Sequence, residues 1–142
     1  MKKRVSFFVC CLCLAFTLGS QAAPITSPFG WRIHPISGQW AFHAGTDIGY
    51  EEGTRIVALH GGKVVYAAPY GGYGNCVIIE DSVGDHQLYG HASKILCSYG
   101  QIVEKNQVIA LVGSTGYSTG PHLHLEYWKN GHYVDPLELW DN

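Results

Sequence analysis

The sequence has almost no helical periodicity, and it contains no internal repeat, linker or low-complexity segment. It therefore predicts one domain that is built from strands rather than helices. Basic residues are also few: the chain has nine Lys and Arg residues, and no basic run follows residue 22, so we expect no nucleic-acid partner. No CxxC pair follows residue 22 either, which disfavours a structural His/Cys zinc site.

The first 22 residues have the organisation of a secretory signal peptide. Residues 2–4 are positively charged, residues 5–18 are uncharged and mostly apolar, and small residues lie at the end of the segment. The apolar run is short for a membrane-spanning helix, which needs roughly 20 residues. We expect cleavage after Ala22, export to the periplasm or the extracellular cell wall, and no stable membrane span in the mature chain.

Loss of this segment changes the charge and the cysteine content. Six Lys and Arg residues then face eleven Asp and Glu residues, a formal charge of −5. Of the five cysteines only Cys76 and Cys97 remain, and the sequence leaves open whether they form a disulfide or stay as two separate thiols. We expect a monomer with one mature domain, residues 23–142.

Strand signals recur along the mature chain. Asn130-Gly131 is a strong hairpin signal, because both central residues of a type I′ turn need positive φ. The expected fold class is all-β: a single domain of antiparallel sheets, sandwich-like or barrel-like, with little helix. The expected strand regions are 54–69 around Gly61-Gly62, 74–81 and 86–93 around the turn Ser82–Asp85, 107–116, and 122–135 around Asn130-Gly131.

The stretch GPHLHLEYW, residues 120–128, places His122 and His124 one residue apart in otherwise apolar surroundings. In a strand, residues i and i+2 point to one face, so both imidazoles and Glu126 would project into the same space. Two interpretations compete for this pair alone. It could be two partly exposed histidines at a strand end, or a metal site, in which neutral imidazole is the commonest ligand.

A second motif, HAGTD, places His43 and Asp47 four residues apart. Combined with a histidine of HxH, it would supply three protein ligands, the number that a catalytic zinc site uses when the fourth position is kept for water. Each motif is weak alone, because such spacings arise by chance. The sequence has no HExxH motif, so the glutamate base of many metalloproteases is absent and other groups would have to take that role.

Six ordered stretches carry a resemblance to one known family. They are SPFGWRIHPISG, HAGTDIG, GTRIVALHGGKVVYA, GGYGNCVIIE, LYGHAS and GSTGYSTGPHLHLE. From about Pro28 to about Pro136 the chain resembles the lysostaphin-type (LytM-like) zinc endopeptidases, which cut peptide cross-links of bacterial peptidoglycan. The resemblance implies the duplicated hybrid motif fold, a zinc metalloendopeptidase catalytic domain in residues 23–142, one Zn²⁺ per chain, and peptidoglycan peptides as substrate.

The resemblance also implies a role for each histidine of the motifs. His43, Asp47 and His124 would be the zinc ligands, whereas His91 and His122 would lie beside the metal as catalytic groups. An imidazole with an ordinary pKa of about 6.5 can accept or donate a proton near neutral pH. One of the pair would act as general base, and the other would stabilise the oxyanion or protonate the leaving nitrogen; the sequence does not say which.

Two further points stay open at this level. Glu126 could orient a ligand histidine through the other ring nitrogen, or it could be a surface acid, and we do not assign it a catalytic role. The function could be that of an active endopeptidase or of a non-catalytic relative that binds and regulates another cell-wall hydrolase. The presence of all five motif residues favours the enzyme, while the bond that is cleaved stays open between D-Ala–diaminopimelate cross-links, glycine bridges and protein substrates.

Overall fold

The computed structural model describes residues 23–140, and the signal peptide predicted for residues 1–22 lies outside them. The helical elements in this part of the chain are two short 3-10 turns, and none of its helices is long and apolar enough to cross a membrane. The elements are β1 (Ile25–Ser27), β2 (Gly30–Ile33), β3 (Trp40–His43), β4 (Thr46–Ile48), β5 (Arg55–Val57), β6 (Gly62–Pro69), η1 (Gly71–Tyr73), β7 (Asn75–Glu80), β8 (His86–Ala92), β9 (Lys94–Ile95), β10 (Ile102–Val103), β11 (Val108–Leu111), β12 (Leu123–Lys129), β13 (His132–Val134) and η2 (Pro136–Leu139).

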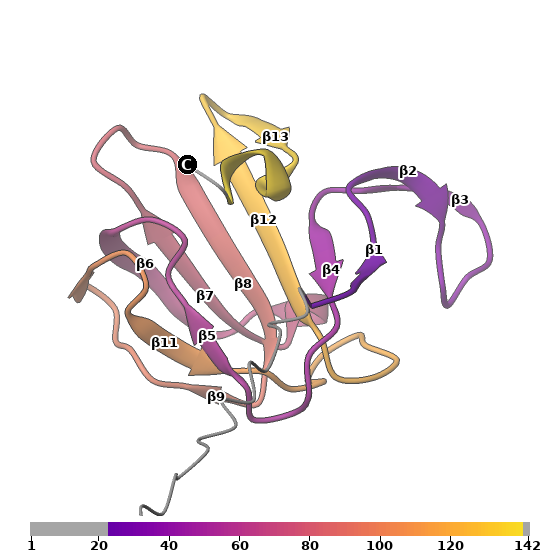
Figure 1. Ribbon diagram of the computed structural model, residues 1–142, viewed down its shortest axis with the longest axis horizontal. Helices are drawn as coiled ribbons and strands as arrows, with labels where there is room; N and C mark the ends of the chain where they lie inside the picture. The colour runs from indigo at the N-terminus through magenta and orange to yellow at the C-terminus, as the bar shows by residue number, and fades with distance from the viewer. Residues whose placement is uncertain (1–22, 141–142) are drawn as a thin grey trace, which may run out of the picture.

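Most strands belong to one large antiparallel sheet with the order β1-β4-β12-β8-β7-β6-β10, and β13 pairs with β12. A smaller sheet, β5-β11-β9, lies beside it, while β2 and β3 form a separate hairpin that projects from the body next to β4 (Figure 1). All strand pairs are antiparallel, which confirms the all-β prediction.

The strand regions expected from the sequence match the observed strands β5 to β8 and β11 to β13. The hairpin between β12 and β13 turns at Asn130 and Gly131, which have φ angles of 51° and 78°, as the predicted turn requires. The strands of residues 25–48 were not among the expected ones. All four strands are only three or four residues long, and most side chains of β1, β2 and β3 are half-exposed or exposed, so these strands lack the long buried apolar runs that mark the others.

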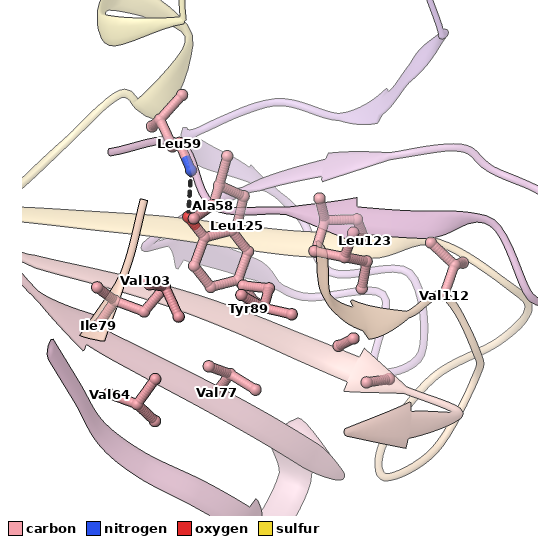
Figure 2. Packing of buried hydrophobic residues seen from close by; sticks show 14 of the residues in the cluster. Ala58, Leu59, Val64, Val77, Ile79, Tyr89, Val103, Val112, Leu123 and Leu125 are labelled. Atoms are coloured by element: carbon pink, nitrogen blue, oxygen red, sulfur yellow. Dashed lines mark hydrogen bonds between the residues drawn. The ribbon is translucent and has the colours of Figure 1, made fainter. Parts of the chain in front are cut away.

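The hydrophobic core lies between one face of the large sheet and the small sheet (Figure 2). Val77 and Ile79 of β7 and Leu123 and Leu125 of β12 point into it, together with Tyr89 of β8. Because alternate residues of a strand point to opposite faces, the residues between them point away from this core. This alternation sends His124 and Glu126 of β12 to the opposite face, where the functional side chains gather.

Tyr89 is fully buried, yet its hydroxyl group is satisfied. It accepts a hydrogen bond from the Leu59 N–H and donates one to Oε1 of Gln87, both at 2.7 Å. The first of these bonds is drawn in Figure 2. Gln87, also fully buried, accepts from the N–H of His60 at 2.9 Å, so this polar group links the loop before β6 to the centre of β8.

Replacing Tyr89 with Phe is expected to lower the free energy of unfolding by about 1–3 kcal/mol, because the buried Leu59 N–H loses its acceptor while the ring stays packed. Urea unfolding of both proteins measures this difference. Tyr99→Phe is the matched control, since Tyr99 is 75% exposed and should give no change. Equal stabilities for the Tyr89 variant and the unaltered chain would contradict this account of the buried network.

The two remaining cysteines are separate. Cys76 is buried in β7 and Cys97 is half-buried, and both are free thiols, which decides the alternative that the sequence left open. Burial, together with the Glu126 carboxylate, raises the pKa of the Cys76 thiol to about 12. A thiol with this pKa is inert near neutral pH, so Cys76 acts as a packing residue behind the functional face.

Candidate metal centre

Pairing of β4, β12 and β8 brings the motif residues together. In the register of the sheet, His124 lies between Asp47 of β4 on one side and Gly90 of β8 on the other. His43 ends β3, and the two residues that follow it lead directly into β4. Gly45 sits in this connection against the backbone of β12, where a Cβ atom would collide with the Leu125 carbonyl oxygen, so only glycine allows so close an approach.

Three side-chain atoms converge at this point. Nδ1 of His124 is 2.7 Å from Oδ1 of Asp47 and 3.2 Å from Nε2 of His43, and the last two atoms are 3.3 Å apart. Among residues 23–140 these three form the one group of His, Cys, Asp and Glu side chains whose donor atoms could hold a metal ion. The two histidines are buried and Asp47 is nearly so, with 13% of its side chain exposed.

The hydrogen atoms of both histidines point away from this convergence. Nδ1 of His43 lies 2.9 Å from the Pro28 carbonyl oxygen, and Nε2 of His124 lies 2.9 Å from Oε1 of Glu126. Carbonyl and carboxylate oxygens only accept, so these ring nitrogens carry the hydrogens. Nε2 of His43 and Nδ1 of His124 are therefore the ring nitrogens that face the centre, which is how ligand histidines are held in metal sites.

Opposing charges dominate the centre when no metal is bound. Burial alone would raise the pKa of Asp47, but the neighbouring His124 and His43 rings, His124 first, outweigh it and hold that pKa well below its usual range. Burial alone would lower the pKa of His124, but the Asp47 and Glu126 carboxylates raise it to about 9. A proton thus occupies the space between these groups in the metal-free protein.

The donor set fits zinc. Two imidazole nitrogens and a carboxylate oxygen that face one another at these distances repel unless a cation lies between them. Donor atoms bound tetrahedrally to one zinc at about 2.0–2.1 Å lie about 3.3 Å apart, and two of the three separations are 3.2 and 3.3 Å. A divalent cation can replace the proton on His124 because ligand histidines bind metal in their neutral form.

Glu126 lies behind His124 and is only 1% exposed, so the alternative of a surface acid is wrong. Its Oε1 accepts from Nε2 of His124 and from the Tyr73 hydroxyl at 2.8 Å, and its Oε2 accepts from Nε1 of Trp128 at 3.0 Å. Burial would raise the pKa of Glu126, but these partners, His124 first, lower it. The carboxylate therefore stays ionised and fixes the ring orientation of His124.

Glu126→Gln is expected to weaken zinc binding about 10–100-fold, because carboxylates that orient ligand histidines have effects of this size on metal affinity. Competition with a chelator of known affinity measures the zinc Kd. Glu80→Gln is the matched control, since Glu80 is exposed and pairs with His86 at 3.1 Å away from the centre. An unchanged zinc Kd in the Glu126 variant would mean that Glu126 serves only packing.

His91 and His122 lie beside the three convergent residues, with their ring centres 4.7 Å apart. Nδ1 of His91 donates to the Thr115 carbonyl oxygen at 2.7 Å, and Nδ1 of His122 donates to the Gly120 carbonyl oxygen at 2.8 Å. Each Nε2 therefore keeps its lone pair. That of His122 lies 3.6 Å from Oδ1 of Asp47, so both rings can hold or release a proton next to the centre.

The position of His91 is held by unusual backbone geometry. Its φ angle is 60°, which residues other than glycine seldom adopt and which costs of order 1–3 kcal/mol. The segment around Thr115 stabilises this conformation, because the Thr115 hydroxyl donates to the Ala92 carbonyl at 2.7 Å while its carbonyl holds the His91 ring. Burial lowers the pKa of His91, so the ring favours its neutral form.

A cavity of about 290 Å³ opens above the centre. Beyond Asp47 and His122 it continues into a second cavity of about 360 Å³, which is lined by Thr26, Ser27 and Pro121 among others. His34 and Tyr117, whose rings stack with centres 6.1 Å apart, form part of the wall of the first cavity. The two cavities share Pro35, Asp47, Thr119 and His122 as lining residues, so together they form a groove across the centre.

All five predicted site residues are thus brought together, His43, Asp47, His91, His122 and His124; their chemical roles stay predictions. Sequence reasoning missed other parts of the site. The backbone carbonyls of Pro28, Thr115 and Gly120 leave no pattern in a sequence. Arg32 and His34, in the wall of the groove, lie in the first of the six ordered stretches, SPFGWRIHPISG. That stretch could have pointed to them, but neither residue has the spacing of a metal ligand.

Known proteins resemble this chain in sequence. The DD-carboxypeptidase/endopeptidase Mpg of Neisseria meningitidis is 44% identical over 115 residues, covering 81% of this chain and 26% of Mpg. The murein hydrolase activator EnvC of Escherichia coli is 34% identical over 131 residues, covering 84% of this chain and 31% of EnvC. The chain spans about a quarter of the length of the curated relatives that match it first.

Solved structures share the fold. The catalytic domain of lysostaphin from Staphylococcus simulans superposes with a TM-score of 0.77 at 32% identity, covering 84% of this chain and 93% of that domain. A zinc-containing peptidase from Vibrio cholerae gives 0.69 at 40% identity, covering 79% of this chain and 35% of that one. The family model for peptidase family M23 matches residues 41–136, which include all five motif residues. On this match, and on a fold it shares with lysostaphin, the chain belongs to peptidase family M23.

Proposed function

We propose that this chain is an exported zinc endopeptidase that acts in the periplasm or at the cell wall and hydrolyses peptide bonds in peptidoglycan stem peptides or cross-bridges. The observation that carries the proposal is the convergence of His43, Asp47 and His124, with one ring nitrogen of each of these two histidines turned to the centre and two further histidines beside them. The names of the relatives, among them a peptidoglycan DD-endopeptidase of Vibrio cholerae, support peptidoglycan as the substrate.

Each part of the site has a task in this reaction. Zinc, when bound, supplies a Lewis acid that activates water and polarises the scissile carbonyl. The groove would hold the peptide across the centre and so position its scissile bond. His91 and His122 keep Nε2 free of protein carbonyl partners, so an unprotonated Nε2 can take the proton of the attacking water, and an Nε2 that carries a proton can pass it to the departing amine.

A second candidate function is that of a non-catalytic activator of another wall hydrolase, which the similarity to EnvC favours. An activator of that kind needs the fold and a binding surface but no metal centre. The complete set of candidate ligands and the two histidines beside them support the enzyme.

The test is to purify the chain without chelator, measure bound zinc and digest purified peptidoglycan sacculi with the same preparation. Mass spectrometry of the released peptides identifies the new termini. Zinc near one equivalent together with new amino termini is the expected result, and the termini name the bond. A protein that stays inert on sacculi after zinc has been restored, but stimulates a separate wall hydrolase, would overturn the enzyme in favour of the activator.

A further inference from the structure

The β2–β3 hairpin turns one of its faces to the metal centre. In its register Gly30 pairs with His43, and Arg32 pairs with Ala41. Paired residues share a face, as do residues i and i+2 of one strand, so Arg32 and His43 lie on the same face. Trp31 lies on the other one and is 64% exposed. The hairpin thus presents a guanidinium group and a candidate ligand side by side.

Arg32 has few partners within the protein. Its Nη1 donates to the carbonyl oxygen of Ile33 at 3.4 Å, which is long for a hydrogen bond. Its Nε is buried and has no hydrogen-bond partner, and no carboxylate of residues 23–140 forms an ion pair with it. A buried donor without an acceptor is costly, so the group is well placed to gain from a ligand that supplies one.

The surroundings of Arg32 define the ligand. Arg32 lines the same cavity of about 290 Å³ as His43, Asp47 and His91, and it is the one Lys or Arg among the described residues that line it. The adjoining cavity on the other side of His122 has no Lys or Arg among its lining residues. Among the described residues, the groove therefore has a single Lys or Arg, which lies in the same cavity as the three convergent side chains.

We propose that Arg32 binds a carboxylate of the substrate peptide and so selects peptides that carry a free carboxylate close to the bond that is cut. This inference rests on the proposed function and narrows its substrate. The guanidinium group offers two parallel N–H donors that match a carboxylate. The D-Ala–diaminopimelate cross-link carries such a carboxylate next to the bond, whereas the interior of a glycine bridge has none, so the first is the preferred substrate.

The test uses one cross-linked peptide in three forms: with all carboxylates free, with the diaminopimelate carboxylate amidated, and with the C-terminal carboxylate amidated. Arg32→Gln should lower kcat/KM for the free peptide about 10–100-fold, the range expected for losing hydrogen bonds to a charged group. Arg32→Gln should not change kcat/KM for the peptide in which the carboxylate bound by Arg32 is amidated. The peptide that shows no change therefore identifies the bound carboxylate. Arg32→Lys should recover part of the loss, and Arg55→Gln, on β5 outside the groove, should behave as the unaltered chain.

An equal loss on all three peptides would overturn the proposal, because it would assign Arg32 a role in the structure of the hairpin alone. No loss on any peptide would overturn it as well. If the unaltered chain cleaves none of the peptides, the proposed function fails, and equilibrium binding of the zinc-loaded protein to the same peptides decides the role of Arg32. A higher affinity for the free form that Arg32→Gln removes would support the proposal, and equal affinities would overturn it.

Discussion

Asp47→Asn should yield a folded protein that retains almost no zinc and no measurable hydrolysis of peptidoglycan peptides. The amide has the shape of the carboxylate but not its charge, so His43 and His124 lose the anion that lies 3.3 and 2.7 Å from them. If about 10 kcal/mol of zinc binding is shared among three ligands, one of them carries about 3 kcal/mol, more than a hundredfold in affinity. His43→Ala and His124→Ala should act in the same direction.

Zinc per chain after dialysis and the rate on cross-linked peptides measure this prediction in one preparation. Asp47→Asn is the most specific test of the three changes. His124→Ala would also leave the buried Glu126 carboxylate without its nearest cation and would destabilise the fold. His132→Ala is the matched control, since His132 is an exposed histidine of β13. An Asp47 variant that kept a full equivalent of zinc would refute the assignment of the ligands.

The local part of the site could be predicted from the sequence. The spacing of His124 and Glu126 predicted that both would point to one face of a strand, and they do: their side chains are in contact at 2.9 Å. The expected turn at Ser82–Asp85 likewise returns the chain so that β8 lies beside β7, with His91 near its end. Such features follow from periodicity and turn chemistry, which act over a few residues.

The rest of the site depends on contacts between distant segments. His91 keeps its strained backbone only because the segment around Thr115, 24 residues later, supplies a carbonyl for its ring. Similarly, Arg32 reaches the centre because β2 pairs with β3. The alternate apolar residues of this hairpin are exposed rather than buried, so their pattern does not predict which face turns to the centre: Trp31, Ile33, Trp40 and Phe42. No periodicity encodes these pairings, since they arise from packing that brings separate loops together.

The second large effect is expected at His91 and His122. Substitution of either histidine should lower activity without lowering zinc binding. Each ring is held by a backbone carbonyl rather than by a ligand residue, and neither belongs to the convergent group of three. His91→Ala and His122→Ala should therefore retain about one zinc per chain, while kcat falls about 10²–10⁴-fold, the usual contribution of a positioned acid or base. The double variant should fall by less than the product of the single effects if the two rings serve one proton-transfer sequence.

Zinc content, kcat and KM on one cross-linked peptide distinguish this role from a structural one, because a loss of transition-state stabilisation lowers kcat with little change in KM. His86→Ala is the matched control, since His86 begins the same strand as His91 but pairs with the exposed Glu80. A His122 variant that lost zinc as completely as the His124 variant would overturn the division between ligand and catalytic histidines. The adjacent pair in HLH would then serve the metal together, and the proton transfers would fall to His91 alone.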